Sequence, residues 1–164
     1  MKVTLKFILL FLLPLGSIAQ FGYPDSLLQD LKSSNSDSLR VSIMSELVLF
    51  YLEGNPDSAI DYCDKVIQVA RRNDKKLDEA AFLGHKGYVL YHQGKYAESL
   101  AYFLQALEIA ENIENKNKTW FQNSYPYTST FTKPGKARAV ILANLHHDLG
   151  HLLGRTGNIE QNVI

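Results

Sequence analysis

The chain has 164 residues, enough for one domain of ordinary size, and 46% of them are hydrophobic, which excludes a disordered chain. Its 17 basic residues balance 17 acidic ones, so no net positive field exists to hold a nucleic acid, and no nucleic acid partner is expected. The single cysteine, Cys63, excludes an internal disulfide and a site of clustered thiolates, and we expect it to be a small buried side chain.

The N-terminus predicts a signal peptide over residues 1–19. Lys2 and Lys6 precede an apolar run at 7–15, and small residues lead up to Ala19. The run is shorter than the roughly 20 residues that cross a bilayer, which favours cleavage after Ala19 over an uncleaved anchor helix. The mature chain would then be secreted or periplasmic. It would carry 15 basic and 17 acidic residues, and no membrane insertion is expected of it, because no second long apolar run follows.

The remaining chain has the spacing of amphipathic helices separated by short polar turns, with no pattern typical of strands. The first expected helix is short, is capped by Asp25 or Ser26 and reaches Lys32, and the second is capped by Asp37 or Ser38 and ends near Leu52. Three more are expected from Asp57 to Arg72, from about Lys75 to His92 and from about Tyr96 to Ile113. After a long loop, a further helix is expected from Lys136 to Arg155, and the beginning of another at 158–164. In the second helix, the predicted inner stripe is Leu39, Ile43, Leu47 and Phe50.

One long segment, residues 115–135, has no helical period and is rich in aromatic residues. Loops of this length are uncommon in compact domains and are usually functional or disordered. Two interpretations stay open. The segment either folds over a binding groove or contacts a partner, or it is a disordered insertion whose aromatic side chains lie against the nearest helix.

The helices repeat in register. Gly87 and Gly94 are seven residues apart, as are Gly150 and Gly157, and Leu47 occupies the position that matches Gly87 and Gly150. A small residue at this position lets the first helix of each unit cross the second closely. Leu47 breaks the rule, so we expect looser packing in the first unit.

The second unit resembles the tetratricopeptide repeat, through Leu83, Lys86, Gly87, Leu90, Ser99, Phe103 and Ala106. It departs from the family pattern because leucines replace the usual tryptophan and tyrosine, and no proline closes the unit. The resemblance implies an all-α fold, an α-solenoid of helix hairpins with about two full repeats and a truncated third. The predicted order is an extension with a short helix at 20–36, repeats 1 and 2 at 37–113, the aromatic loop at 114–135 and the partial third repeat at 136–164. A plain four-helix bundle is the alternative, and the matched glycines favour the solenoid.

The order of signal peptide and repeats also resembles the periplasmic N-terminal sensor region of Gram-negative regulators that contain such repeats. There the repeats precede a membrane helix and a histidine kinase, a cyclase or a DNA-binding domain. No such output motif is present here. Since the third repeat stops within its second helix, we expect a fragment of a longer protein, or else a truncated, non-functional remnant. The exposed repeat ends would allow homo-oligomers.

The resemblance implies that the first helices of the repeats line a concave groove that binds a protein or peptide. Carried over by register, the groove positions are Val41, Met44, Val48 and Tyr51, then Ala81, Gly84, Tyr88, Tyr91 and His92, then Asn144, His147, His151 and Arg155. The predicted partner-binding residues among them are Tyr51, Tyr88, Tyr91, His92, Asn144, His147, His151 and Arg155. Tyrosines suit peptide recognition because they offer large contact area with few rotamers to freeze. The alternative is that Tyr88 and Tyr91 only pack against neighbouring helices.

His147 and His151 lie four residues apart on one predicted helix face, with Asp148 beside the first, and this pattern is typical of zinc hydrolases. Against that interpretation, aspartate is a shorter base than glutamate, no third ligand follows, and the repeat already explains Gly150. We therefore expect no catalytic residues, no metal and no cofactor, with a zinc-dependent hydrolase as the alternative.

Overall fold

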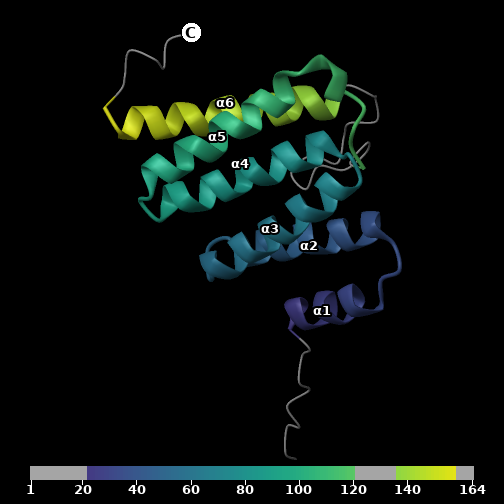
Figure 1. Cartoon of the computed structure of the whole chain (residues 1–164). Coiled ribbons are helices and arrows are strands. Elements are labelled where there is room, and N and C mark those ends of the chain that lie inside the picture. The colour runs from purple at the N-terminus through teal and green to yellow at the C-terminus, as the bar shows by residue number, and fades with distance from the viewer. Residues whose placement is uncertain (1–21, 121–135, 158–164) are drawn as a thin grey trace, which may run out of the picture.

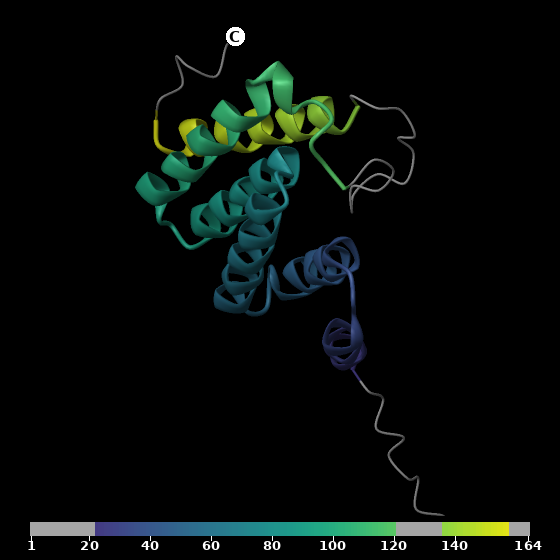
Figure 2. The same cartoon turned by 45° about the vertical axis from the view of Figure 1, so that its right-hand side comes forward.

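The computed structural model describes residues 22–120 and 136–157 of the chain, and these ranges contain helices and no strand. The helices stack in chain order, from α1 at one end to α6 at the other (Figures 1 and 2). Their bounds are α1 Tyr23–Ser33, α2 Asp37–Tyr51, α3 Pro56–Arg72, α4 Lys76–His92, α5 Tyr96–Glu111, the 3-10 turn η1 Ile113–Asn115, and α6 Lys136–Arg155. The predicted all-α solenoid of helix hairpins is confirmed.

Short polar turns set the helix boundaries. Ser36 caps α2 by accepting a hydrogen bond from the Leu39 N–H at 3.2 Å, and Asn55 caps α3 by accepting one from the Ser58 N–H at 3.1 Å. Gly94 ends the α4–α5 turn with φ +75°, a conformation that glycine adopts without steric cost.

Several predicted boundaries are wrong by one to four residues. The N-cap of α1 is Gly22 rather than Asp25 or Ser26, because Pro24 suits the first turn of a helix. α2 is capped by Ser36 rather than by Asp37 or Ser38. α5 ends at Glu111 instead of Ile113, where the chain tightens into the 3-10 turn that the Asn112 side chain caps.

The α4–α5 hairpin is closed around Gly87. A Cβ atom at Gly87 would lie 2.9 Å from Cε1 of Phe103, so only glycine lets α5 approach this closely. At the same crossing, the buried Ser99 hydroxyl donates a hydrogen bond of 2.7 Å to the Gly87 carbonyl. The predicted reason for a small residue at this repeat position is confirmed.

The α2–α3 hairpin is built differently at the matching position. Leu47 is fully buried, and it belongs with Leu27 of α1 and Ile43 to a small separate cluster. The two helices of this hairpin lie close to one another over fewer residues than α4 and α5 do. The first unit therefore packs less closely, as predicted.

The main core runs from α2 to α6 and is centred on α4. Of the 17 residues of α4, 11 are buried, and α4 packs against α3, α5 and α6. Phe82, Leu83 and Phe103 are among its largest buried side chains. Cys63 is fully buried and joins this core, as predicted.

The predicted inner stripe of α2 is half wrong. Ile43 and Leu47 are buried, but Leu39 is 51% and Phe50 45% exposed. Three residues that the repeat register places in the groove are instead buried in the main core, namely Val41, Met44 and Val48. The reason is that α2 is covered twice, by the main core on one side and by α1 on another, so its apolar surface is broader than one stripe.

Among the helices in 22–120 and 136–157, none is both long enough and apolar enough to cross a membrane. The predicted signal peptide, the aromatic residues Phe121, Tyr125, Tyr127 and Phe131, and the last predicted helix at 158–164 lie outside the described residues.

Candidate partner-binding groove

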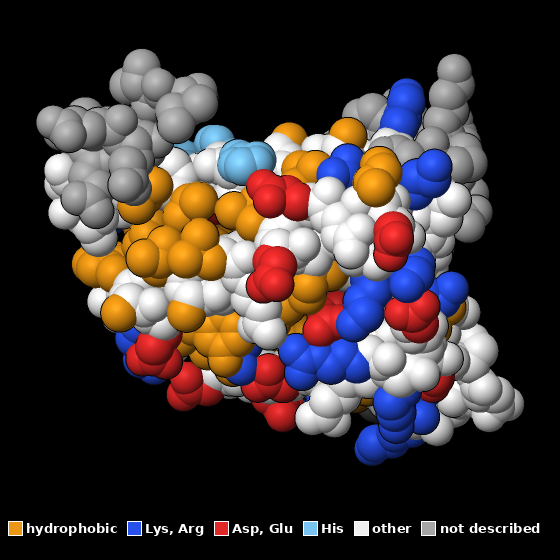
Figure 3. Space-filling model, turned by 45° about the horizontal axis from the view of Figure 1, so that its top comes forward, with side chains coloured by type: hydrophobic (Ala, Val, Ile, Leu, Met, Phe, Trp, Pro, Cys, Tyr) orange, Lys and Arg blue, Asp and Glu red, His pale blue; other side chains and the backbone are white. Residues whose placement is uncertain are grey.

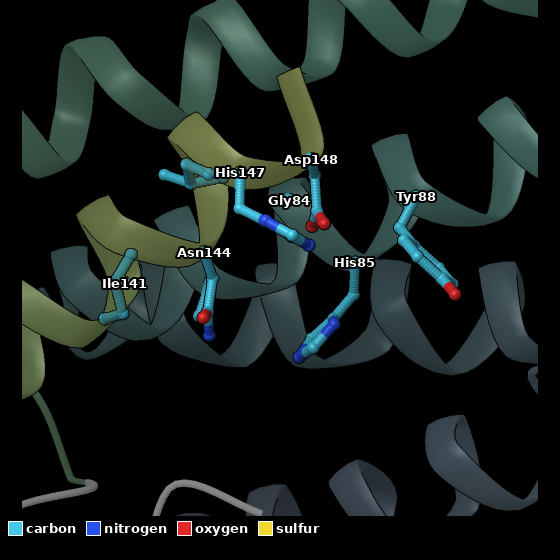
Figure 4. Close-up of a pocket in the computed structure, with 9 residues that line it drawn as sticks. Gly84, His85, Tyr88, Ile141, Asn144, His147 and Asp148 are labelled. Carbon is cyan, nitrogen blue, oxygen red and sulfur yellow. The ribbon is translucent and has the colours of Figure 1, made fainter. Parts of the chain in front are cut away.

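A cleft lies between α4 and α6. It has a volume of about 350 Å³. Figure 4 shows the labelled residues of α4 and α6 that line this hollow. The α4 wall consists of Ala81, Gly84, His85 and Tyr88, and the α6 wall of Ile141, Asn144, Leu145, His147 and Asp148.

Small residues on α4 allow α6 to lie this close. A Cβ atom at Gly84 would be only 2.5 Å from Cδ2 of Leu145, and Leu145 is buried beneath the cleft. Ala81, one turn earlier, is also buried. The floor of the cleft is therefore apolar, while its rim carries polar side chains from both helices.

The cleft continues toward the C-terminal end of α4 as a second hollow of about 240 Å³, lined by Tyr88, Tyr91, His92, His147, Asp148 and His151. Aromatic rings crowd this part. The Tyr88 and His92 ring centres lie 4.4 Å apart, and those of Tyr91 and His92 lie 5.0 Å apart. On α6, the Nε2 atoms of His147 and His151 lie 3.1 Å from each other.

Three of the lining side chains have shifted pKa values. Partial burial raises the pKa of Asp148, against the opposing effect of His147, His151 and His92. Burial also raises the pKa of Tyr88, with Asp148 adding to the effect. Loss of hydration lowers the pKa of His85 to about 4, so this imidazole is neutral at pH 7. Figure 3 shows histidine side chains at the molecular surface, with hydrophobic and acidic side chains beside them.

Six of the eight predicted partner-binding residues meet in this cleft, namely Tyr88, Tyr91, His92, Asn144, His147 and His151. A seventh, Arg155, holds its guanidinium 5.8 Å from the centre of the Tyr91 ring. Tyr51 does not join them: its ring stacks on Tyr62 at 5.9 Å, on the side of α2 and α3 that faces α1. That these residues bind a partner stays a prediction.

The register did not identify His85 as a lining residue, and it placed Asp148 only beside a candidate zinc ligand. His85 lies three residues before Tyr88, one helical turn away on the same face. That spacing is the signal from which it could have been found. The same signal exists for Asp148, which lies four residues after Asn144 and three before His151, on the same face of α6.

Within the described ranges, no group of three or more His, Cys, Asp or Glu side chains has the arrangement of a metal site. A catalytic zinc usually has three protein ligands. The alternative of a zinc-dependent hydrolase therefore lacks its third ligand in this part of the chain.

The beginning of the predicted loop is ordered at the other end of α4. The buried Asp78 carboxylate accepts hydrogen bonds from the Thr119 hydroxyl at 3.1 Å and from the Trp120 N–H at 3.0 Å. The Lys118 carbonyl accepts one from the Leu77 N–H, which gives the first turn of α4 the acceptor that its own N-cap side chain does not supply. Residues 115–120 are thus a fixed part of the fold, and the two interpretations of the rest of the loop concern residues outside the described ranges.

Comparison with known proteins gives one match. No curated protein matches the chain, and no solved structure matches it. Residues 42–112 match the model of a family described as Tetratricopeptide repeat. This part of the chain, which runs through α2, α3, α4 and α5 and includes the α4 wall of the cleft, is therefore similar to tetratricopeptide repeats.

Proposed function

We propose that this chain binds a protein or peptide segment in the cleft between α4 and α6, and that it acts as the sensor or scaffold module of an envelope signalling protein. Tetratricopeptide repeats generally mediate protein–protein interactions and are typically not catalytic, which supports the first part. The second part rests on the predicted signal peptide and on the resemblance to periplasmic sensor regions.

The observation that carries the proposal is the convergence of six register-predicted residues in one cleft. Its floor is apolar around Gly84 and Leu145, and its rim offers tyrosine hydroxyl, imidazole and amide groups. Such a combination suits an extended or helical peptide, because apolar side chains can fill the floor while its polar groups bond to the rim.

Tyr88 contributes to both hollows of the cleft and is expected to be an energetic centre of binding. Replacing Tyr88 with alanine should weaken the binding of peptides selected on the wild-type protein by about 30-fold, because a central aromatic residue typically contributes about 2 kcal/mol. Peptides would be selected from a random display library and their dissociation constants measured by fluorescence anisotropy.

Tyr23 provides the matched control, because it is an exposed tyrosine on α1, far along the stack from the cleft. Tyr23→Ala should leave those dissociation constants within about twofold of the wild-type values. Circular dichroism would verify that both variants are folded. Equal loss of binding in the two variants, or no loss in Tyr88→Ala, would remove the cleft from the proposal.

The predicted secreted or periplasmic localisation has its own test. Expressed in a Gram-negative host with a Sec pathway, the full-length chain should be recovered from the periplasmic fraction with Gln20 as its first residue. Intact-mass spectrometry of the fractionated protein measures this directly, and replacing Ala19 with a bulky residue should block the cleavage. Recovery of uncleaved protein from the cytoplasm would contradict the envelope assignment without affecting the cleft.

A further inference from the structure

The two histidines of α6 have a geometry that peptide binding does not require. His147 and His151 are both exposed, their ring centres lie 4.4 Å apart with planes at 82°, and their Nε2 atoms are 3.1 Å apart. The two Nε2 atoms therefore lie next to each other at the edge of the cleft. Figure 4 shows the His147 side chain extending from α6 toward α4, next to Asp148.

This arrangement is close to that of two ligands on one metal ion. Two imidazole nitrogens bound to a tetrahedral Zn²⁺, each at about 2.05 Å, lie about 3.3 Å apart. The observed separation of 3.1 Å differs from that by a few tenths of an ångström, which small side-chain rotations can supply. Histidines at i and i+4 lie on one helix face, so the helix backbone itself sets the spacing.

We propose that His147 and His151 together bind one divalent transition-metal ion of the type that prefers imidazole, with Zn²⁺ and Cu²⁺ as its natural occupants. Because the described residues supply no third ligand, water molecules complete the coordination. The site is therefore a two-histidine chelate that is open toward the cleft, and it stands whether or not the cleft takes a peptide.

The surroundings favour a cation on balance. The Asp148 carboxylate lines the same hollow and is half-buried, so its attraction for a cation is less screened than it would be in bulk water. His92, Tyr88 and Tyr91 face the hollow from α4. The positive charge of Arg155, one turn beyond His151, repels a metal ion. Its guanidinium, however, lies over the Tyr91 ring, 5.8 Å from the ring centre.

Binding would require no change of fold. α6 is held by the buried side chains of Ile141, Leu145 and Leu152, while both histidines stay in solvent. In the absence of metal, the two rings can share one N–H···N hydrogen bond, and such a bond between exposed side chains contributes little to stability. A chelated metal ion can therefore replace it at small cost.

The test uses the tag-free chain and ZnCl₂ or CuSO₄ as probes, in isothermal titration calorimetry at pH 7.5. We expect one ion per chain, with the affinity lowered about tenfold or more in His147→Ala and in His151→Ala. His146→Ala is the matched control, since His146 is an exposed histidine on the same helix next to His147 and takes no part in the pair. Its affinity should stay within about twofold of the wild-type value.

Two further measurements sharpen the result. The affinity should fall in acidic solution, because protonated imidazole cannot bind a metal. The electron paramagnetic resonance spectrum of the Cu²⁺ complex should show coupling to two imidazole nitrogens, and to only one in either alanine variant. Absence of binding to the wild-type chain at millimolar metal would overturn the proposal. So would an equal loss of affinity in His146→Ala and His147→Ala.

Discussion

Replacing Gly87 with leucine is expected to lower the free energy of unfolding by about 2–3 kcal/mol. The new Cβ atom alone would lie 2.9, 3.0 and 3.3 Å from Cε1, Cδ1 and Cγ of Phe103. The Phe103 ring is fully buried, so it cannot swing into solvent to make room. The hydrogen bond from Ser99 to the Gly87 carbonyl holds the two backbones at this distance, so the helices cannot separate without losing it.

A double-mutant cycle separates this clash from a general loss of stability. Phe103→Ala alone should cost about 3–5 kcal/mol, because it leaves a cavity in the main core. In the double variant, the leucine side chain can fill part of that cavity. The loss in the free energy of unfolding should therefore be smaller, by about 1–3 kcal/mol, than the sum of the losses in the two single variants. Urea unfolding followed by circular dichroism measures all four proteins.

Gly84→Ala serves as the control for adding a Cβ atom to α4. Here the close neighbour is the terminal Cδ2 of Leu145, which a side-chain rotation can move, and alanine favours the helix over glycine by about 1 kcal/mol. The free energy of unfolding should therefore change little. If Gly87→Leu and Phe103→Ala were strictly additive, the ring would not be what excludes a side chain at position 87.

The contrast between Gly87 and Leu47 shows how far the sequence determines the fold. The repeat register alone predicted that the α4–α5 crossing needs a small residue and that the matching crossing in the first unit is looser, and both are confirmed. The register works because it depends on a contact within one hairpin. It failed for Val41, Met44 and Val48, because their environment depends on how α1 and the main core cover α2, which spacing along one helix does not encode.

The same distinction applies to the cleft. The register placed Tyr88, Tyr91 and His92 on one face of α4 and Asn144, His147 and His151 on one face of α6, and these faces do meet. The sequence could not supply the depth of the cleft, which follows from Gly84 lying against Leu145 across more than 60 residues of chain. Nor could it supply the 3.1 Å contact between His147 and His151, which depends on side-chain rotamers.

The least predictable feature is Asp78, a fully buried acid in the first turn of α4. Burial raises its pKa to about 6, although the hydrogen bonds from the Trp120 N–H and the Thr119 hydroxyl and the charge of Lys75 lower it. The folded state therefore binds the Asp78 proton more tightly than the unfolded chain, in which the pKa is about 3.9. The contribution of this group to stability is largest below pH 4 and is lost as the pH rises through about 6.

The expected result is a pH-dependent difference between the wild-type protein and Asp78→Asn. Asparagine does not titrate, so the free energy of unfolding of the wild type, minus that of the variant, should fall by about 2 kcal/mol between pH 4 and pH 7. Trp120 is the only tryptophan of the chain, and its backbone N–H donates a hydrogen bond to the Asp78 carboxylate. Its fluorescence therefore reports unfolding in urea at each pH.

Asp30→Asn is the control for the change in formal charge, because Asp30 is exposed on α1. Its free energy of unfolding should follow the wild-type pH dependence. A difference between wild type and Asp78→Asn that stayed constant from pH 4 to pH 7 would mean that the Asp78 carboxylate is not destabilised by burial. The hydrogen bonds from the Thr119 hydroxyl and the Trp120 backbone N–H would then fully offset the loss of hydration, and the contact of residues 118–120 with α4 would not weaken as the pH rises from 4 to 7.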